Sequence, residues 1–359
     1  MFREDFVWGV ASSAYQVEGT DAADGRGACV WDMFAADGRV FEHQNAGTSC
    51  DHMHHYKEDI ALMKHLGIRA YRFSLNWARI LPEGTGRVNE KAIAMYRDMI
   101  LTMKENGITP YLTLFHWEFP QALYERGGWQ NPDVVQWFGE YAKVVAENFS
   151  DICEYFITIN EPQCVVGLGH LSGVHAPGVK LPVAQTFLVA HHLLMAHGQA
   201  VINLRRYAVR PVKIGFAPTG GVAYPYTDRP EDIEAAKKVY FGFYNPIDNW
   251  TWNVSWFSDP VFLGHYPEEG LKKFAPYLPE ITQEDMELIY QPLDFMGQNI
   301  YNGYYVRAGA DGEPEFVDRA PGFPKTGSDW PVTPEAFYYG IKFLTERYPL
   351  PLYITENGM

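Results

Sequence analysis

The sequence of 359 residues has little cysteine and no long apolar run. Its cysteines have no CxxC spacing, so a zinc or disulfide framework is not supported and reduced thiols are expected. No run of about 18 apolar residues occurs, which argues against a membrane-spanning helix. The N-terminal residues include acids and no apolar region, so we expect no signal peptide and a cytoplasmic protein. The four cysteines are Cys29, Cys50, Cys153 and Cys164.

Positive charge is also scarce. The chain has 29 Lys+Arg against 44 Asp+Glu, a net charge of −15, so neither a nucleic acid nor an anionic membrane is an expected partner. No linker, low-complexity segment or tandem repeat interrupts it, and we expect residues 1–359 to form one domain. Aromatic residues are abundant at 15%, which suits pockets for ligands with an apolar face and a hydroxylated rim.

Short apolar runs alternate with amphipathic stretches along the chain, which predicts a parallel sheet with helices outside. Polar residues follow nearly every predicted strand. A barrel gathers all such positions on one face, whereas a doubly wound sheet gathers ligands at a switch point. We therefore predict an α/β fold of the (β/α)8 TIM-barrel type. The predicted strands are 6–11, 70–75, 110–115, 155–159, 212–217, 293–298 and 352–355, and the predicted helices include 56–66, 91–106, 134–148, 183–207 and 334–347.

Helix ends are marked by characteristic residues. Gly67 and Gly107 follow two predicted helices, where a left-handed residue is expected. Thr333 precedes Pro334, which predicts an N-cap followed by proline at the first helical position.

The barrel is expected to be incomplete. A (β/α)8 barrel uses about 30 residues for each unit, and we identify seven strands and no eighth strand or accompanying helix. The first and seventh predicted strands would then keep unpaired edges. Binding of a complementing C-terminal fragment, or formation of a homo-oligomer, remains a possible interaction of this chain.

Two glutamates each end an apolar run. Glu161 lies in Thr-Ile-Asn-Glu-Pro and Glu356 in Ile-Thr-Glu-Asn-Gly. A lone glutamate of this kind would be a helix cap or a solvated loop residue, but the pair is more specific. Paired carboxylates suit the acid and nucleophile roles of glycoside hydrolysis, at about 5–5.5 Å in retaining enzymes and about 6.5–9.5 Å in inverting ones. The sequence leaves that distance open.

Two polar neighbours fit this chemistry. Arg72 follows the second strand and is the natural cation to keep one carboxylate ionised, while mutual repulsion raises the pKa of the other. Asn160 offers an amide to a ligand hydroxyl. The histidines at 52, 54, 55, 191, 192 and 197 do not gather three ligands on one helical face, so no metal is predicted. Two carboxylates and water suffice, so no cofactor is expected.

Several segments together resemble glycoside hydrolase family 1, the β-glucosidases. The resemblance implies a TIM barrel and a retaining mechanism acting on small β-glycosides or oligosaccharides. The segments are FVWGVASSAYQVE (6–18), YRFSLNW (71–77), FHWEFP (115–120), TINEP (158–162), HAPG (175–178), DFMGQNIY (294–301) and TENG (355–358).

By motif position, the resemblance implies that Glu161 is the acid/base and Glu356 the nucleophile. It also implies that Tyr301 hydrogen-bonds the nucleophile. Of the remaining positions, Gln16, His116 and Asn160 would hold sugar hydroxyls, Asn299 would lie beside the nucleophile, Trp117 would shape the glycone pocket and Trp330 would flank the aglycone.

Departures from the family pattern are few. Ile300 replaces a common tyrosine, and Glu118-Phe119 replaces Asp-Leu; neither is expected to touch the chemistry directly. Within the family, the phospho-specific relatives tend to differ at Tyr15, Pro162 and Thr355, so the resemblance favours plain glycosides over 6-phosphoglycosides. The acidic chain agrees, because it would not attract a phosphate. The alternatives are a 6-phospho-β-glycosidase, an inactive fragment or non-catalytic sugar-binding protein, and transglycosylation through the same intermediate.

Overall fold

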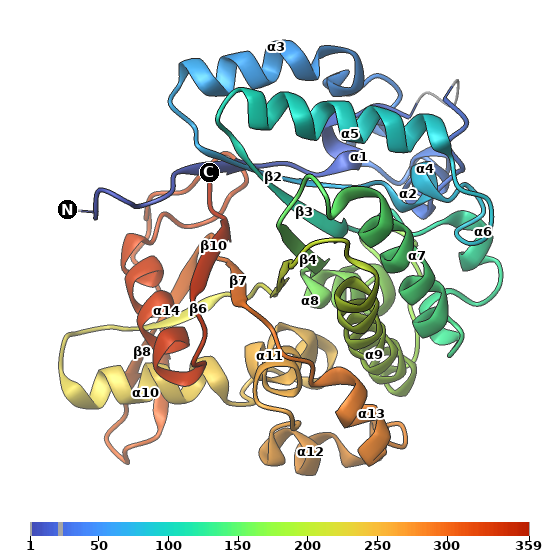
Figure 1. The fold of residues 1–359 in the computed structure, drawn as a ribbon. Coiled ribbons are helices and arrows are strands. Elements are labelled where there is room, and N and C mark those ends of the chain that lie inside the picture. Colours follow the sequence, from blue (N-terminus) through green and yellow to red (C-terminus); the bar gives the residue numbers. More distant parts are fainter. Residues whose placement is uncertain (1, 21–23, 359) are drawn as a thin grey trace.

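Seven parallel strands form the central sheet of the computed structural model, which describes residues 2–20 and 24–358 (Figure 1). Their order is β1-β2-β3-β4-β5-β7-β10, and every neighbouring pair is parallel. Spatial order follows chain order, as in a barrel wall and unlike a doubly wound sheet, so the predicted fold class is confirmed. The strands are β1 (Gly9–Ala11), β2 (Ala70–Ser74), β3 (Thr109–Phe115), β4 (Tyr155–Asn160), β5 (Lys213–Ala217), β7 (Phe295–Asn299) and β10 (Leu352–Glu356).

Helices lie outside this sheet, and α7 and α9 pack against each other beside β4 (Figure 1). In the described part of the chain, no helix combines the length and the apolar character needed to cross a bilayer. The helices are α1 (Ala14–Val17), α2 (Val30–Ala36), α3 (His52–His65), α4 (Trp77–Ile80), α5 (Glu90–Glu105), α6 (Gln121–Tyr124), α7 (Val134–Phe149), α8 (Pro162–Val166), α9 (Val183–Tyr207), α10 (Pro230–Phe241), α11 (Val254–Phe262), α12 (Glu268–Phe274), α13 (Gln283–Ile289) and α14 (Pro334–Arg347).

A second, three-stranded sheet was not predicted. It consists of β6 (Val222–Pro225), β8 (Gly303–Ala308) and β9 (Pro314–Val317). β6 pairs parallel with β8, and β8 pairs antiparallel with β9. Helices α10 and α14 pack against this sheet (Figure 1), so it forms a small layer beside β7 and β10.

Two of the three predicted helix-end features are confirmed. Gly67 and Gly107 have φ of +76° and +75°, the left-handed region that glycine adopts without a steric penalty. Pro334 begins α14, but the preceding Thr333 makes no side-chain hydrogen bond to that helix. Its hydroxyl instead accepts the backbone N–H of Gly303 at 3.1 Å. Thr333 therefore holds the predicted N-cap position but does not cap the helix with its side chain, because the second sheet offers another donor.

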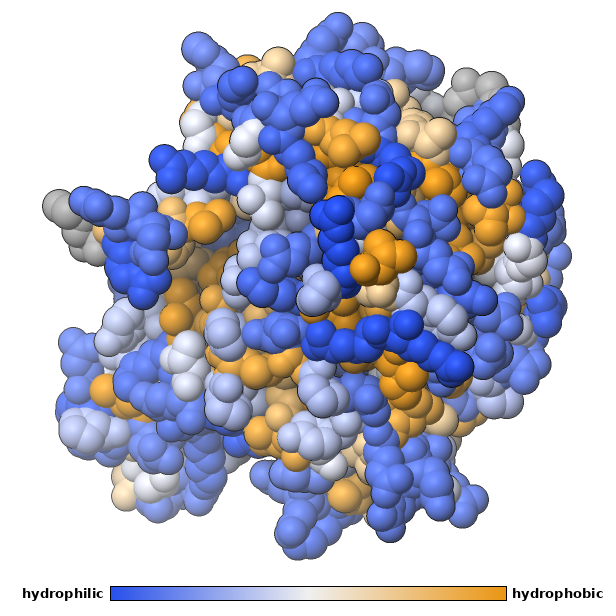
Figure 2. All heavy atoms as spheres, viewed as in Figure 1, coloured by the Kyte–Doolittle hydropathy of each residue, from blue (hydrophilic) through white to orange (hydrophobic). Residues whose placement is uncertain are grey.

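β1 and β10 are the edge strands of the main sheet. Among residues 2–20 and 24–358, no backbone ladder joins them. All residues of β1 are exposed and those of β10 are half-buried, whereas every residue of β2 and β7 is buried. In Figure 2, hydrophobic residues show left of centre, in the area where Figure 1 places β10. The core therefore lies between the inner strands and the helices.

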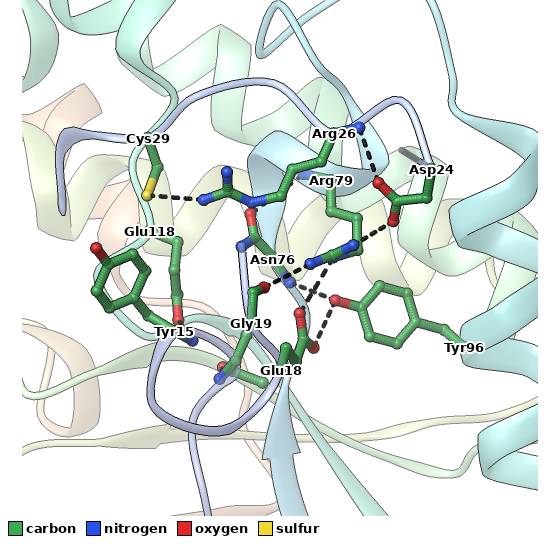
Figure 3. A network of polar contacts seen from close by, with 12 residues as sticks. Tyr15, Glu18, Gly19, Asp24, Arg26, Cys29, Asn76, Arg79, Tyr96 and Glu118 are labelled. Atoms are coloured by element: carbon green, nitrogen blue, oxygen red, sulfur yellow. Dashed lines mark hydrogen bonds and ion pairs between the residues drawn. The ribbon is translucent and has the colours of Figure 1, made fainter. Parts of the chain in front are cut away.

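A buried ion-pair network fixes the segment after α1 (Figure 3). The Arg79 guanidinium of α4 bonds Glu18 at 3.2 Å and the Gly19 carbonyl at 2.9 Å, and it also reaches Asp24. The Tyr96 hydroxyl of α5 donates to Glu18 at 2.7 Å. Burial raises the pKa of Glu18, although Arg79 and Tyr96 oppose that rise. The network therefore ties the chain after β1 to helices α4 and α5.

Replacing Arg79 with Met is expected to lower the free energy of unfolding by about 3–5 kcal/mol, because it leaves Glu18 buried without its cation. Denaturant unfolding would measure the loss. Lys325→Met is the matched control, since the Lys325–Asp329 pair is exposed and such pairs contribute at most about 1 kcal/mol. Equal effects of the two substitutions would contradict a structural role for the network.

Candidate active site

The predicted catalytic residues come together at the carboxyl ends of the strands. β4 ends at Asn160 and is followed by Glu161, β7 ends at Asn299, and β10 ends at Glu356. Arg72 lies within β2, not after the strand as predicted, and its guanidinium reaches the same end of the sheet. The carboxyl ends of a barrel's strands are where such enzymes carry their chemistry.

A continuous chain of hydrogen bonds links the two glutamates. Arg72 donates from Nη1 to Glu356 Oε1 at 2.6 Å and from Nη2 to Asn160 Oδ1 at 2.7 Å. Asn299 Nδ2 donates to Asn160 Oδ1 at 3.0 Å and to Glu161 Oε1 at 2.7 Å. The two carboxyl groups, distant in sequence, thus belong to one buried polar cluster.

Glu356 sits in a cationic and hydrogen-bonding environment. Besides Arg72, the Tyr301 hydroxyl donates to its Oε2 at 2.5 Å. Burial acts to raise the pKa of Glu356, but Arg72 and the Tyr301 hydroxyl outweigh it and hold that pKa below its usual value. Glu356 is therefore the carboxylate that stays ionised.

Glu161 has the opposite environment. Its residue is 6% exposed, and burial first, then the negative charge of Glu356, raise its pKa. Hydrogen bonds from Asn299 and from the Cys164 thiol oppose this rise without cancelling it. Glu161 is therefore the group of the pair that can hold a proton. Opposite pKa shifts in two carboxyl groups of one site are typical of an acid paired with a base.

His116 joins this cluster as a neutral ring. Its Nε2 lies 3.0 Å from Asn160 Nδ2, and because that amide nitrogen can only donate, Nε2 accepts and the ring proton lies on Nδ1. Burial lowers the pKa of His116 to about 3. The buried Nδ1 makes no hydrogen bond within the described part of the chain.

The backbone at the site is strained at two non-glycine residues. Glu161 has φ +45° and ψ +69°, and Trp117 has φ +88°. Such conformations cost about 1–3 kcal/mol each and cluster at functional sites. Pro162 follows Glu161 as the first residue of α8, and the Glu161 N–H bonds the Ala217 carbonyl at 2.8 Å. The end of β4 therefore turns sharply and aims Glu161 into the cluster.

The predicted sugar-contacting residues are only partly assembled around the glutamates. Trp117 donates from Nε1 to the Asn160 carbonyl at 3.1 Å. Trp330 is 42% exposed and lies edge-on to Tyr301, with ring centres 5.1 Å apart. Gln16 is exposed on α1, and its side chain makes no hydrogen bond with the described residues. Its contact with a ligand stays a prediction.

Two supporting residues were missed from sequence. Cys164 places its Sγ 3.1 Å from Glu161 Oε2. Glu118 accepts the backbone N–H of Tyr15 at 2.8 Å (Figure 3), which attaches the segment bearing Gln16 to the loop after β3. The spacing of three residues from Glu161 could have indicated Cys164, since that spacing places residues on one helical face. No comparable sequence signal identified Glu118.

Glu118 gives a pH-dependent prediction. Burial raises its pKa from 4.5 to about 8, and its Oε2 is buried without a hydrogen bond from the described residues. Between these two values the unfolded chain loses this proton and the folded chain keeps it. Folding stability therefore falls by about 1.4 kcal/mol per pH unit through this group. Glu118→Gln keeps an acceptor for Tyr15 and cannot titrate.

The stability of Glu118→Gln relative to the native chain is therefore expected to be lowest near pH 4 and to increase up to about pH 8, measured by denaturant unfolding across that range. Glu105→Gln, at an exposed position, is the matched control. A difference that does not vary with pH would mean that Glu118 is ionised in the folded chain.

A TIM-barrel wall with two hydrogen-bond-linked carboxyl groups at its carboxyl end is typical of a glycoside hydrolase. Sequence comparison agrees, since the family described as Glycosyl hydrolase family 1 matches residues 1–359. The chain belongs to this family, as its sequence motifs predicted.

The similar proteins include a β-glucosidase and a 1,4-beta-D-glucan glucohydrolase. Beta-glucosidase A of Thermotoga maritima is 42% identical, and the match covers 99% of this chain and 78% of that protein. A 1,4-beta-D-glucan glucohydrolase of Thermotoga neapolitana is 41% identical over 99% of this chain and 82% of its own. The solved structure of the Thermotoga maritima β-glucosidase with glucoimidazole has a TM-score of 0.87 at 42% identity, covering 99% and 79% of the two chains.

Proposed function

We propose that this protein is a retaining β-glycosidase that hydrolyses short, unphosphorylated β-linked glucosides, with Glu356 as nucleophile and Glu161 as acid/base. The observation that carries the proposal is the hydrogen-bonded cluster that joins two carboxyl groups in unlike surroundings: Glu356 bonds Arg72 and Tyr301, whereas Glu161 is buried against Asn299. One is held ionised and the other is able to hold a proton, which is the division of labour that a double displacement needs.

In the first step, Glu356 attacks the anomeric carbon and forms a covalent ester with the sugar. The bond to the leaving oxygen breaks, and Glu161 gives that oxygen its proton. Arg72 and Tyr301 hold Glu356 in position through its two oxygens. As the negative charge on Glu356 is consumed, the repulsion that raised the pKa of Glu161 disappears.

In the second step, Glu161 is ionised and takes a proton from water. The water oxygen attacks the anomeric carbon, the ester bond breaks, and Glu356 leaves as a carboxylate. Arg72 and Tyr301 again stabilise that charge. The sugar leaves with its original β-configuration, and both glutamates have regained their starting protonation states.

The remaining residues have binding roles in this proposal. Gln16, His116 and Asn160 hold glycone hydroxyls. Asn299 fixes Glu161 at 2.7 Å. The aromatic pair Tyr301 and Trp330 borders the aglycone. An aromatic face against a sugar ring buries its apolar side and leaves its hydroxyls to polar partners.

The proposal is tested by proton NMR of the first sugar released from an aryl β-glucoside, before it mutarotates. We expect the β-anomer, and in parallel a covalent adduct on Glu356 after incubation with a fluorinated glucoside whose second step is slow. An α-anomer as the first product would overturn the retaining mechanism. An adduct on another residue would overturn the assignment of the nucleophile.

A 6-phospho-β-glycosidase is the alternative. The net charge of −15 does not favour attraction of a dianionic phosphate. Comparing kcat/KM for an aryl β-glucoside with that for its 6-phosphate separates the two substrates, and we expect the plain glucoside to be preferred.

A further inference from the structure

Cys164, in the short helix that follows Glu161, contacts the Glu161 carboxyl group. Glu161 precedes α8 and Cys164 is the third residue after it, so both side chains lie on one side of the first turn. The thiol Sγ lies 3.1 Å from Glu161 Oε2. Cys164 is 6% exposed and also lines an apolar hollow with Trp117 and Val165, an environment that strengthens a polar contact.

The two oxygens of Glu161 have different partners. Thr355 Oγ1 donates to Asn299 Oδ1 at 2.6 Å, which fixes the orientation of the Asn299 amide and turns its Nδ2 toward Glu161 Oε1. An amide nitrogen can only donate, so a proton on Oε1 would face another hydrogen. The proton of Glu161 therefore belongs on Oε2, the oxygen beside the thiol.

Cys164 keeps its own proton. Burial first, then the charge of Glu161, raise the pKa of this thiol well above its usual value, so the group is a neutral S–H and not a thiolate. An S–H group can donate weakly to a carboxylate and can rotate away when that oxygen is protonated.

We propose that Cys164 is a positioning residue that controls the acid/base proton of Glu161: its thiol donates to Oε2 when Glu161 is ionised and withdraws when Oε2 holds the proton. This inference rests on the proposed function of Glu161. The thiol touches no reacting atom and acts only through that carboxyl group. It stabilises the ionised form that follows proton delivery in the first step and precedes proton uptake in the second.

The alkaline limb of kcat/KM reports ionisation of the acid in the free enzyme. Cys164→Ala removes a donor to the ionised form, so we expect the limb to move to higher pH by about 0.5–1 unit. Cys164→Ser restores a donor and should place the limb at lower pH than alanine does. A limb that Ala leaves in place, or that coincides for Ala and Ser, would overturn the inference.

Cys153→Ala is the matched control. Cys153 is also buried, but its thiol faces backbone carbonyls of β3 and β4, those of Pro110 at 3.6 Å and Tyr155 at 3.4 Å. Its replacement removes the same atom from a buried site and should leave the alkaline limb unmoved. An equal shift in both alanine variants would assign the effect to packing and overturn the inference.

Raman spectroscopy of the S–H stretch gives a readout independent of turnover. The difference between the native chain and Cys164→Ala isolates the Cys164 band. We expect it to rise in frequency as pH falls and Glu161 takes up its proton, and to be independent of pH in Glu161→Gln, whose amide nitrogen faces the thiol. A native S–H band that does not change with pH would overturn the role of Cys164 but leave the proposed role of Glu161 intact. The S–H band could instead change with pH while the alkaline limb of kcat/KM stays the same in Cys164→Ala. That result would overturn the acid/base role of Glu161 and, with it, the inference.

Discussion

Glu356→Gln is expected to reduce kcat on a chromogenic β-glucoside by about 10⁴-fold or more, the order found when a covalent nucleophile is removed. Glutamine has the same shape and can keep a hydrogen bond with Tyr301 or Arg72. Its amide has no negative charge with which to attack the anomeric carbon. The loss should therefore appear in kcat for every leaving group, because the first step itself fails.

Glu105→Gln, an exposed replacement of the same kind, controls for handling and purity, and circular dichroism checks that both variants fold. Arg72 would face an uncharged partner in Glu356→Gln, so the stability of that variant should be measured as well. Hydrolysis within tenfold of the native rate would show that Glu356 is not the nucleophile.

Glu161→Ala is expected to show a loss that depends on the leaving group. For alkyl glucosides and disaccharides, kcat/KM should fall by about 10²–10⁴-fold, the usual contribution of general acid catalysis. Aryl glucosides with acidic phenols need little protonation and should lose much less in the first step. The measurement is kcat/KM across a series of aryl glucosides graded by the pKa of the phenol.

The second step of Glu161→Ala supplies an internal control. Water needs a base to attack the covalent intermediate, whereas azide is already an anion, so added azide should restore turnover of reactive aryl glucosides. The same addition should not rescue Glu356→Gln, which forms no intermediate. A uniform loss across all leaving groups would contradict the acid/base role.

The main sheet was predictable because each of its strands is a short apolar run next to an amphipathic helix. The strand at 352–355 was expected and is found as Leu352–Glu356. The second sheet was missed because β6 and β8 are separated by a long stretch of chain, and neither has a pattern that distinguishes it from a connecting loop. Their pairing depends on the tertiary fold, as the changed role of Thr333 also does.

At the active site, the sequence predicted which residues take part better than it predicted which side chains contact one another. Arg72 was expected beside the ionised carboxylate from its charge and its place at the second strand, and it bonds Glu356 at 2.6 Å. The spacing from Glu161 to Cys164 was visible in the sequence, but the contact of Glu118 depends on a backbone turn near Trp117, which periodicity does not reveal. The roles of Gln16 and Trp330, and the single-domain assignment of residues 1–359, stay predictions.

The left-handed backbone of Glu161 creates a trade-off between activity and thermal stability. At φ +45° a glycine would fit without the steric penalty that a side chain incurs. Directed evolution for thermal survival alone would therefore favour losing the Glu161 carboxyl, our proposed acid/base, since nothing in such a selection rewards proton transfer. Libraries built to stabilise this chain should hold position 161 fixed and seek their gains elsewhere.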